Sequence, residues 1–316
     1  MMTELSEAIS PMPEGGPAAA MAHAGGCSCE ACAGKPRSAP EQYVYALGRF
    51  DVKFPTIGIE REFQQRERAL KAQQSAARGR KLRQVLEANS HLALRVAYTF
   101  GLGATPTYLV MPSSGSQRAE FLEAIERVGD TNHVSVLIGR MGPLASPAMS
   151  GGLVAPIVMA DKIYTFSLDE WQKGLESSLE RAVKSRDIKK DAFNEVCREL
   201  FHRLALMAEN MGVTDGHRAL NYLLVQHPGL FLAAAERAKR QVLDRVETRV
   251  IHGPGMRRQV AVIFTFLDSS TGVPERLFCR VDVTEEWPFV TDGSGTGSAP
   301  LGLSPYVEGT LAPSLM

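Results

Sequence analysis

Apolar and polar residues follow two periods along the chain, and each period predicts a different kind of element. Residues 43–55 and 153–168 alternate in the manner of β-strands. TYLVM, from residue 107, and VSVLIG, at 134–139, are short apolar runs typical of buried strands. A glycine- and proline-rich stretch, residues 140–152, separates the run at 134–139 from the segment at 153–168. Together these segments predict a small mixed sheet in the first half of the chain.

Helical spacing separates these strands and dominates the middle of the chain. Thr214 or Asp215 is placed to cap one of the helices, and Gly212 to end another. The spacing predicts helices at residues 60–77, 82–99, 117–128, 170–184, 190–211, 217–227 and 230–247.

Near the C-terminus the period returns to two. Residues 259–266 and 276–283 alternate around the turn-rich DSSTGVPE, which predicts a β-hairpin with a long loop. The fold class we expect is therefore α+β, with a helical middle flanked by small mixed sheets and a C-terminal β-hairpin.

Composition divides the chain into three parts. Residues 1–40 are rich in Ala, Gly, Pro, Met and Ser and predict a flexible leader that contains cysteines. Residues 41–290 form the predicted domain, which can also divide into two lobes, 41–168 and 169–290. Residues 291–316 begin with TDGSGTGSAPLG and predict a flexible tail.

Charge and hydropathy exclude several classes of protein. The 316 residues carry 35 basic and 35 acidic side chains, so the basic excess expected of a nucleic-acid-binding protein is missing. No apolar run is long enough for a membrane span, and the N-terminal sequence does not resemble a secretory signal. Five cysteines, an odd number, favour a reducing environment. We therefore expect a cytoplasmic protein that binds neither nucleic acid nor membrane.

The sequence CSCEAC places Cys27, Cys29 and Cys32 within six residues. C-x-x-C spacing lets one tight turn present two thiolates to a metal, so these three cysteines predict a Zn²⁺ site. Unpaired thiols in a mobile segment are the alternative, and a redox dithiol is a third interpretation. The fourth zinc ligand would come from a second chain or from one of three residues, His23, Cys197 or Cys279.

A polar cluster is predicted where NMGVTDGHRALNY, residues 210–222, begins a helix. His217 and Asn221 are four residues apart and share one helix face, with Arg218 beside them. Together with the N–H groups of the helix start, these side chains could form a peptide-binding ledge. The alternative is a structural one, in which a cap and buried hydrogen bonds join the helix to a sheet.

The motif RVDVTEEWPF, residues 280–289, places Asp282, Glu285 and Glu286 beside Arg280. Paired carboxylates can act as general acid and base. Because neighbouring residues of a strand face opposite sides, ion pairing is the alternative. No nucleophile elbow, H-E-x-x-H motif, phosphate loop or kinase motif is present, so the catalytic residues, if any, are unknown.

Four segments of the chain carry a resemblance to a known family: residues 43–65, 136–158, 210–228 and 281–289. In this order they resemble the C-terminal domain of the cyanobactin maturation proteases of the PatA/PatG type. The resemblance spans residues 42–290, and the chain has no room for the subtilisin-like protease domain of those proteins. It implies a role in the biosynthesis of ribosomally made, post-translationally modified peptides.

From this resemblance we expect an accessory, non-catalytic module for peptide recognition or scaffolding, whose partners are a precursor peptide, peptide-processing enzymes or both. The expected anchors are His217, Arg218 and Asn221, and the edge of the hairpin at 259–283 is a candidate for pairing with an extended peptide. A homodimer is a further possibility. The alternative is an uncharacterised peptide-modifying enzyme that depends on the metal or on the acidic motif.

Overall fold

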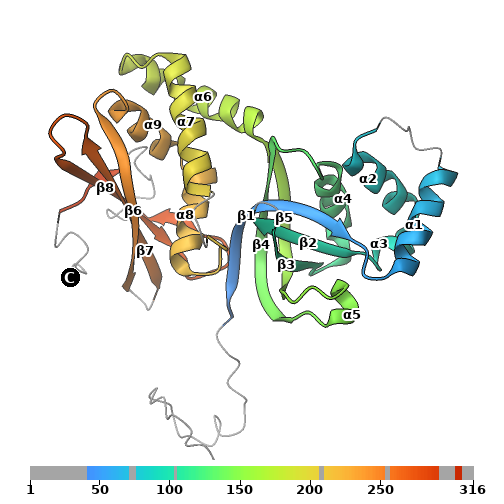
Figure 1. Cartoon of the computed structure of the whole chain (residues 1–316). Coiled ribbons are helices and arrows are strands. Elements are labelled where there is room, and N and C mark those ends of the chain that lie inside the picture. Colours follow the sequence, from blue (N-terminus) through green and yellow to red (C-terminus); the bar gives the residue numbers. More distant parts are fainter. Residues whose placement is uncertain are drawn as a thin grey trace, which may run out of the picture. The chain divides into compact units, whose positions relative to one another are not determined.

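The computed structural model describes residues 41–70, 76–102, 105–205, 210–252, 257–291 and 303–307. In these residues a five-stranded barrel with small helices is followed by four helices and a second sheet (Figure 1). The predicted α+β class is confirmed. The cysteine cluster at residues 27–32 lies outside the described residues, and the division into a leader, two lobes and a tail stays a prediction.

The first sheet closes on itself in the order β1-β2-β3-β5-β4. All neighbours are antiparallel except β3 and β5, which are parallel. β4 continues into the first part of the predicted glycine- and proline-rich loop, because Met141 and Leu144 pair with Val158 and Pro156 of β5. The strands are β1 Tyr43–Lys53, β2 Ala97–Leu102, β3 Thr105–Pro112, β4 His133–Leu144 and β5 Pro156–Ser167.

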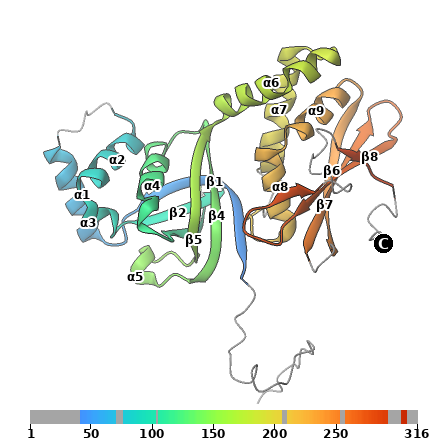
Figure 2. The ribbon, with the colours of Figure 1, turned by 180° about the vertical axis from the view of Figure 1, so that it is seen from behind.

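Small helices pack beside the barrel, as Figure 2 shows from behind. The helix predicted at 82–99 is wrong beyond residue 93, because Tyr98 and Phe100 lie in strand β2. The ring of Tyr98 stacks on Phe50 and meets Phe121 edge-on, contacts that a continued helix would lose. The elements are α1 Ile57–Ala69, α2 Arg78–Ala88, α3 Ser90–Ala93, the 3-10 turn Gly115–Gln117, α4 Arg118–Glu126 and α5 Pro147–Ser150.

Four helices follow the barrel, as predicted for the middle of the chain. Ser167 caps the first of them, because its hydroxyl accepts from the backbone N–H of Glu170. The prediction of a helix through residue 247 is wrong. The fourth helix ends at Arg237, and a strand begins at Gln241 that pairs along its whole length with the next strand. The helices are α6 Leu168–Ser185, α7 Lys190–Ala205, α8 Asp215–Gln226 and α9 Pro228–Arg237.

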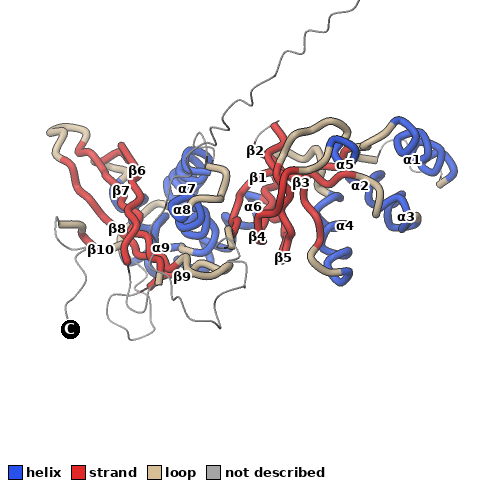
Figure 3. The backbone as a smooth tube through the Cα atoms, turned by 90° about the horizontal axis from the view of Figure 1, so that it is seen from below, coloured by secondary structure: helices blue, strands red, loops and turns tan. Residues whose placement is uncertain are grey.

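The second sheet has the order β10-β8-β7-β6, and β9 also pairs with β8. The predicted hairpin exists as β7 and β8. The prediction that this hairpin is an open edge is wrong, because β7 lies between β6 and β8 while β8 also pairs with β9 and β10. Figure 3 shows β6 at the margin of the sheet. The strands are β6 Gln241–His252, β7 Arg258–Asp268, β8 Pro274–Asp282, β9 Phe289–Thr291 and β10 Ser304–Pro305.

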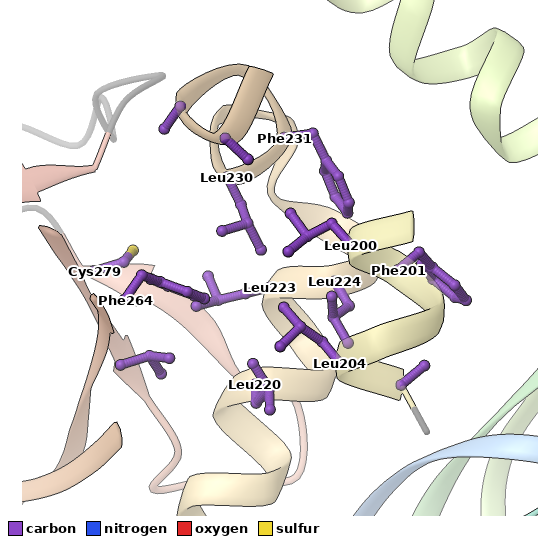
Figure 4. Close-up of a cluster of buried hydrophobic side chains, with 14 of the residues drawn as sticks. Leu200, Phe201, Leu204, Leu220, Leu223, Leu224, Leu230, Phe231, Phe264 and Cys279 are labelled. Atoms are coloured by element: carbon purple, nitrogen blue, oxygen red, sulfur yellow. The ribbon is translucent and has the colours of Figure 1, made fainter. Parts of the chain in front are cut away.

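One hydrophobic core joins the helices to the second sheet and reaches the barrel wall. Leu223 of α8 and Phe264 of β7 meet in it, and Leu200 of α7 approaches them (Figure 4). Tyr45 of β1 and Val136 of β4 belong to the same core. No helix among the described residues has the length and apolarity needed to cross a membrane.

Candidate functional site

The predicted polar cluster begins at a capped helix start. Thr214 is the N-cap of α8, and its hydroxyl accepts from the backbone N–H of His217 at 3.1 Å. The cap therefore falls on one of the two residues that the sequence indicated. His217 itself is half-buried.

Arg218 is the largest fully buried side chain of the described residues, with 1% of its surface exposed. Its guanidinium donates to the backbone carbonyls of Val283, at 2.8 Å, and of Glu285. Burial lowers the pKa of Arg218 to about 10, although the Asp215 carboxylate at 3.6 Å opposes the shift. The planar group also lies over the ring of Tyr43, at 5.3 Å from its centre. Arg218 thus ties α8 to the loop after β8 and to β1.

Asn221 is completely buried on the same helix. Its amide N–H donates to the Tyr45 carbonyl at 2.9 Å, and its oxygen accepts from the Asn210 amide at 2.7 Å. The second hydrogen bond fixes the segment before α8, and the first joins α8 to the barrel strand β1. Two of the three residues predicted to form a ledge therefore make the buried hydrogen bonds of the structural alternative. Their use in peptide binding stays a prediction.

The acidic motif separates into two environments. Asp282 is buried and accepts from Arg257 at 2.6 Å and from the backbone N–H of Thr284 at 3.0 Å. Burial alone would raise its pKa, but these hydrogen bonds outweigh burial and hold it below the usual value. Asp282 is therefore an ion-paired structural group, while Glu285 is exposed.

Glu286 instead faces a carboxylate of the barrel, Asp161 on β5. Burial, followed by the hydrogen bond and the charge of Asp161, raises the pKa of Glu286 to about 7, against the opposing effect of Arg140 and Arg218. Arg140 lies 3.4 Å from Asp161. The pKa of Asp161 is lowered: burial opposes the change, and hydrogen bonds from Glu286 and Arg140 outweigh it. Asp161 of the barrel strand β5 and Glu286 of the loop after β8 thus have pKa values shifted in opposite directions.

The barrel side carries a second feature, an apolar pocket with a volume of about 550 Å³. Its walls come from β2, β3, α3, α4, α5 and the start of α1. Leu94 and Met149, at the lining, are 87% and 42% exposed, so their apolar surface is open to a ligand. Two arginines, Arg95 and Arg118, contribute the positive charge of the lining. Six of the apolar lining residues are Ile59, Val96, Leu109, Met111, Phe121 and Leu122.

Sequence reasoning missed this pocket. Its residues come from segments spread over nearly a hundred positions, from Pro55 to Met149. Met149 lies in SPAMSGG, which the pattern assigns to a loop, whereas Pro147–Ser150 form the short helix α5. Leu94 and Val96 fall inside the helix predicted at residues 82–99, so their positions carried no signal of a pocket.

A polar groove of about 780 Å³ lies between α6 and α7. Several of its charged side chains are in ion pairs: Asp169 with Arg198 of the same groove at 2.9 Å, and Glu176 with Lys190 at 2.8 Å. The apolar pocket is the better candidate for ligand binding, because its lining offers apolar surface that a ligand would remove from water.

Cys197 and Cys279, two of the residues suggested as a fourth zinc ligand, are buried free thiols in the core. Burial raises the pKa of each to about 12, which disfavours the thiolate that a metal requires. Across the described part of the chain, no group of three or more His, Cys, Asp or Glu side chains is arranged to hold a metal ion. Zinc binding by Cys27, Cys29 and Cys32 stays a prediction.

Comparisons with known proteins place this fold. Residues 187–294 match the family model described as PatG C-terminal. A solved structure described as a PatG domain of unknown function is similar to the chain with a TM-score of 0.59 and 19% sequence identity, covering 79% of this chain and 97% of the other. No curated protein sequence matches. At this identity the structural likeness establishes the fold, and with the family match it shows that the chain carries a PatG C-terminal-type domain.

Proposed function

We propose that the protein is an accessory recognition module of a cyanobactin-like peptide pathway, and that it holds the precursor peptide by apolar side chains that enter the barrel pocket. The PatG C-terminal match supports the pathway. The apolar pocket of about 550 Å³, with Leu94 and Met149 exposed at its lining, is the observation that carries the binding role.

The pocket has the size and chemistry for a few side chains of a peptide. Ligand pockets commonly measure about 300–1,000 Å³ and are mostly apolar with a few polar groups. Burying one Leu or Phe side chain contributes about 1.5–3 kcal/mol. Arg95 and Arg118 in the lining complement an acidic residue or a carboxylate beside the apolar side chains.

The pocket is a better contact surface than the predicted ledge. Arg218 and Asn221 would have to leave buried hydrogen bonds before they could touch a peptide. Leu94 can contact a peptide without breaking any hydrogen bond of its side chain, because 87% of its surface is exposed. In this proposal α8 stabilises the contact between the barrel and the second sheet, and the barrel pocket binds the peptide.

Substitution at the pocket tests the proposal. Leu94→Asp and Met149→Asp should each weaken binding of the precursor peptide encoded beside the gene, by about 10-fold or more, because a carboxylate replaces apolar contact area. Isothermal titration calorimetry measures the affinity. Val273→Asp is the matched control, because Val273 is 62% exposed in the loop between β7 and β8. Equal affinities for the wild-type chain and all three variants would contradict the proposal.

A second candidate is a peptide-modifying enzyme, and the carboxyl pair Asp161–Glu286 favours it. Groups whose pKa values are pushed apart are typical of an acid and a base in one site. In this case the precursor peptide would change in mass on incubation, and Glu286→Gln would abolish the change while Leu94→Asp only weakened binding. An unchanged peptide mass would favour recognition alone.

A further inference from the structure

The strand β6 is a long edge whose sequence is complementary to itself. Among the described residues it pairs only with β7, over the register Gln241↔Asp268 to His252↔Arg258. On an edge strand, alternate N–H and C=O groups point away from the single neighbour and can accept another strand. Figure 3 shows β6 at the margin of the row of strands, with α7 and α8 on one face of the sheet.

We propose that β6 pairs antiparallel with β6 of a second copy of this chain, about a two-fold axis at Thr248. This pairing joins the second sheets of two protomers into one continuous sheet. It needs a surface that is complementary to itself, as every two-fold interface does. The proposal does not depend on the peptide pocket, which lies on the barrel.

The two faces of β6 follow from its register with β7. Val246 and Val250 lie opposite Phe264 and Val260, which belong to the core under the helices. Glu247 and Arg249 lie opposite Ile263 and Ala261, on the other face. Residues directly opposite in an antiparallel pair share a face, so these two sets decide which side chains can meet.

With the axis at Thr248, the pairs nearest the axis are favourable. Glu247 lies opposite the partner's Arg249, and Val246 lies opposite the partner's Val250, each pair occurring twice. Thr248 lies opposite the partner's Thr248 on the axis. Opposite charges and Thr–Thr pairs that lie directly opposite on neighbouring strands stabilise a sheet. Val250, now 59% exposed, becomes covered on its open side.

Neighbouring registers are worse. An axis at Glu247 would set that carboxylate against its own copy and Arg245 against the partner's Arg249. An axis at Val246 would place the irregular part of β6, between Leu243 and Arg245, among the paired residues. The Asp244 carbonyl in this part already accepts a hydrogen bond from the guanidinium of Arg203 at 3.3 Å. The register at Thr248 keeps the irregularity outside the central paired residues.

An extended peptide is the other occupant that an edge strand can take. The self-complementary order of Val246, Glu247, Arg249 and Val250 about one residue favours a second copy, since a peptide partner requires no such symmetry. A chain that stays monomeric alone but pairs with a peptide along β6 would therefore overturn the proposal.

Charge reversal on β6 tests it. Sedimentation velocity of the full chain at micromolar concentration should show a dimer. Glu247→Arg and Arg249→Glu should each weaken dimerisation by 10-fold or more, because like charges then face each other across the axis. The double variant E247R/R249E should restore it, because both cross-strand pairs become opposite again. A monomeric wild-type chain, single variants that dimerise normally, or a double variant that stays monomeric would overturn the proposal.

Two controls separate the pairing from folding. Arg249 also donates to the Tyr306 hydroxyl at 2.9 Å, so the thermal midpoint of each variant is measured first. Glu180→Arg and Lys184→Glu reverse an exposed ion pair on α6 and should leave the dimer unchanged. In addition, Thr248→Cys should give a disulfide-linked dimer under mild oxidation, more than the unsubstituted chain; the same yield from both would overturn the register.

Discussion

Arg218 shows how one buried residue can have a structural explanation that its sequence position does not reveal. A charged side chain beside a helix N-terminus suggests a ligand, and the spacing to Asn221 supports that interpretation. The guanidinium instead donates hydrogen bonds to the backbone carbonyls of Val283 and Glu285. These residues are more than sixty positions away in the chain, so a local sequence pattern cannot predict the contact. The N-cap at Thr214 was predictable because capping is a local interaction.

Removing this guanidinium should be costly. Arg218→Ala leaves the Val283 and Glu285 carbonyls without their donor and Asp215 without its buried counter-ion, so we expect the free energy of unfolding to fall by about 3–5 kcal/mol. Urea denaturation measures it. Arg198→Ala is the control, because the exposed pair of Arg198 with Asp169 should contribute less than about 1 kcal/mol. Similar losses in the two variants would contradict the structural role of Arg218.

Glu286 gives the stability of the protein a pH dependence of known sign. Its pKa is about 7 in the folded protein and 4.5 as the ordinary value, so protonation favours the folded state. The contribution of Glu286 is complete below about pH 4.5 and is lost as the pH rises through 7. Asp161, whose pKa is lowered, acts in the opposite sense and only at more acidic pH.

Glu286→Gln should therefore stabilise the protein at pH 8 by about 1–2 kcal/mol, less than the full pKa shift implies because solvent screens this half-buried group, and should have little effect at pH 5. Urea denaturation of both proteins at several pH values measures the difference. Asp282→Asn is a contrasting variant, because its carboxylate is stabilised by Arg257 and its loss should destabilise at pH 8. A Glu286→Gln effect that is the same at pH 5 and pH 8 would rule out the raised pKa of Glu286.

At the scale of elements, the segment before α8 depends on one glycine. Gly212 has φ +76°, and a Cβ there would lie 2.4 Å from the Tyr45 carbonyl oxygen. The same segment accepts from the Tyr45 N–H at 2.9 Å and from the Tyr108 hydroxyl at 2.7 Å. The close approach of this turn to β1 and β3 positions α8, and with it Asn221.

Gly212→Ala should thus destabilise by more than the backbone conformation alone requires. Gly152, with φ +90° and open space around it, provides the comparison. We expect about 1–2 kcal/mol for Gly152→Ala and at least about 2 kcal/mol more for Gly212→Ala, since only the latter displaces backbone. The thermal midpoints of unfolding of the two variants measure this difference. Equal shifts in the thermal midpoint would show that β1 does not constrain the turn.

The elements differ in how well their sequences predict them. α8 begins and ends within local signals, a threonine cap and Pro228, so its limits were predictable. β6 was not, because the helical periodicity of LFLAAAER continues into QVLDRVETRVIH and the outcome is decided by pairing with β7. Strand β2 was lost to a helix prediction for the same reason.

For the whole molecule, the α+β class followed from the two periods of the sequence, while closure of the barrel did not. Closure depends on the antiparallel contact of β1 with β4 and the parallel contact of β3 with β5, which link residues far apart in the chain. The apolar pocket is a consequence of this closure and of the helices around it. The segments that resemble PatG domains include parts of β1, β4 and α8, whose residues Tyr45, Val136 and Leu223 belong to one core.

The central claim is that the protein binds a precursor peptide without altering it. The most direct measurement is native mass spectrometry of the full chain mixed with the precursor peptide encoded beside its gene; the same spectrum would carry the mass increment of any zinc bound at Cys27, Cys29 and Cys32. We predict a complex with an unchanged peptide mass that is much weaker for Leu94→Asp and unaffected by Val273→Asp. A peptide of altered mass, or no complex at all with the wild-type chain, would contradict the account.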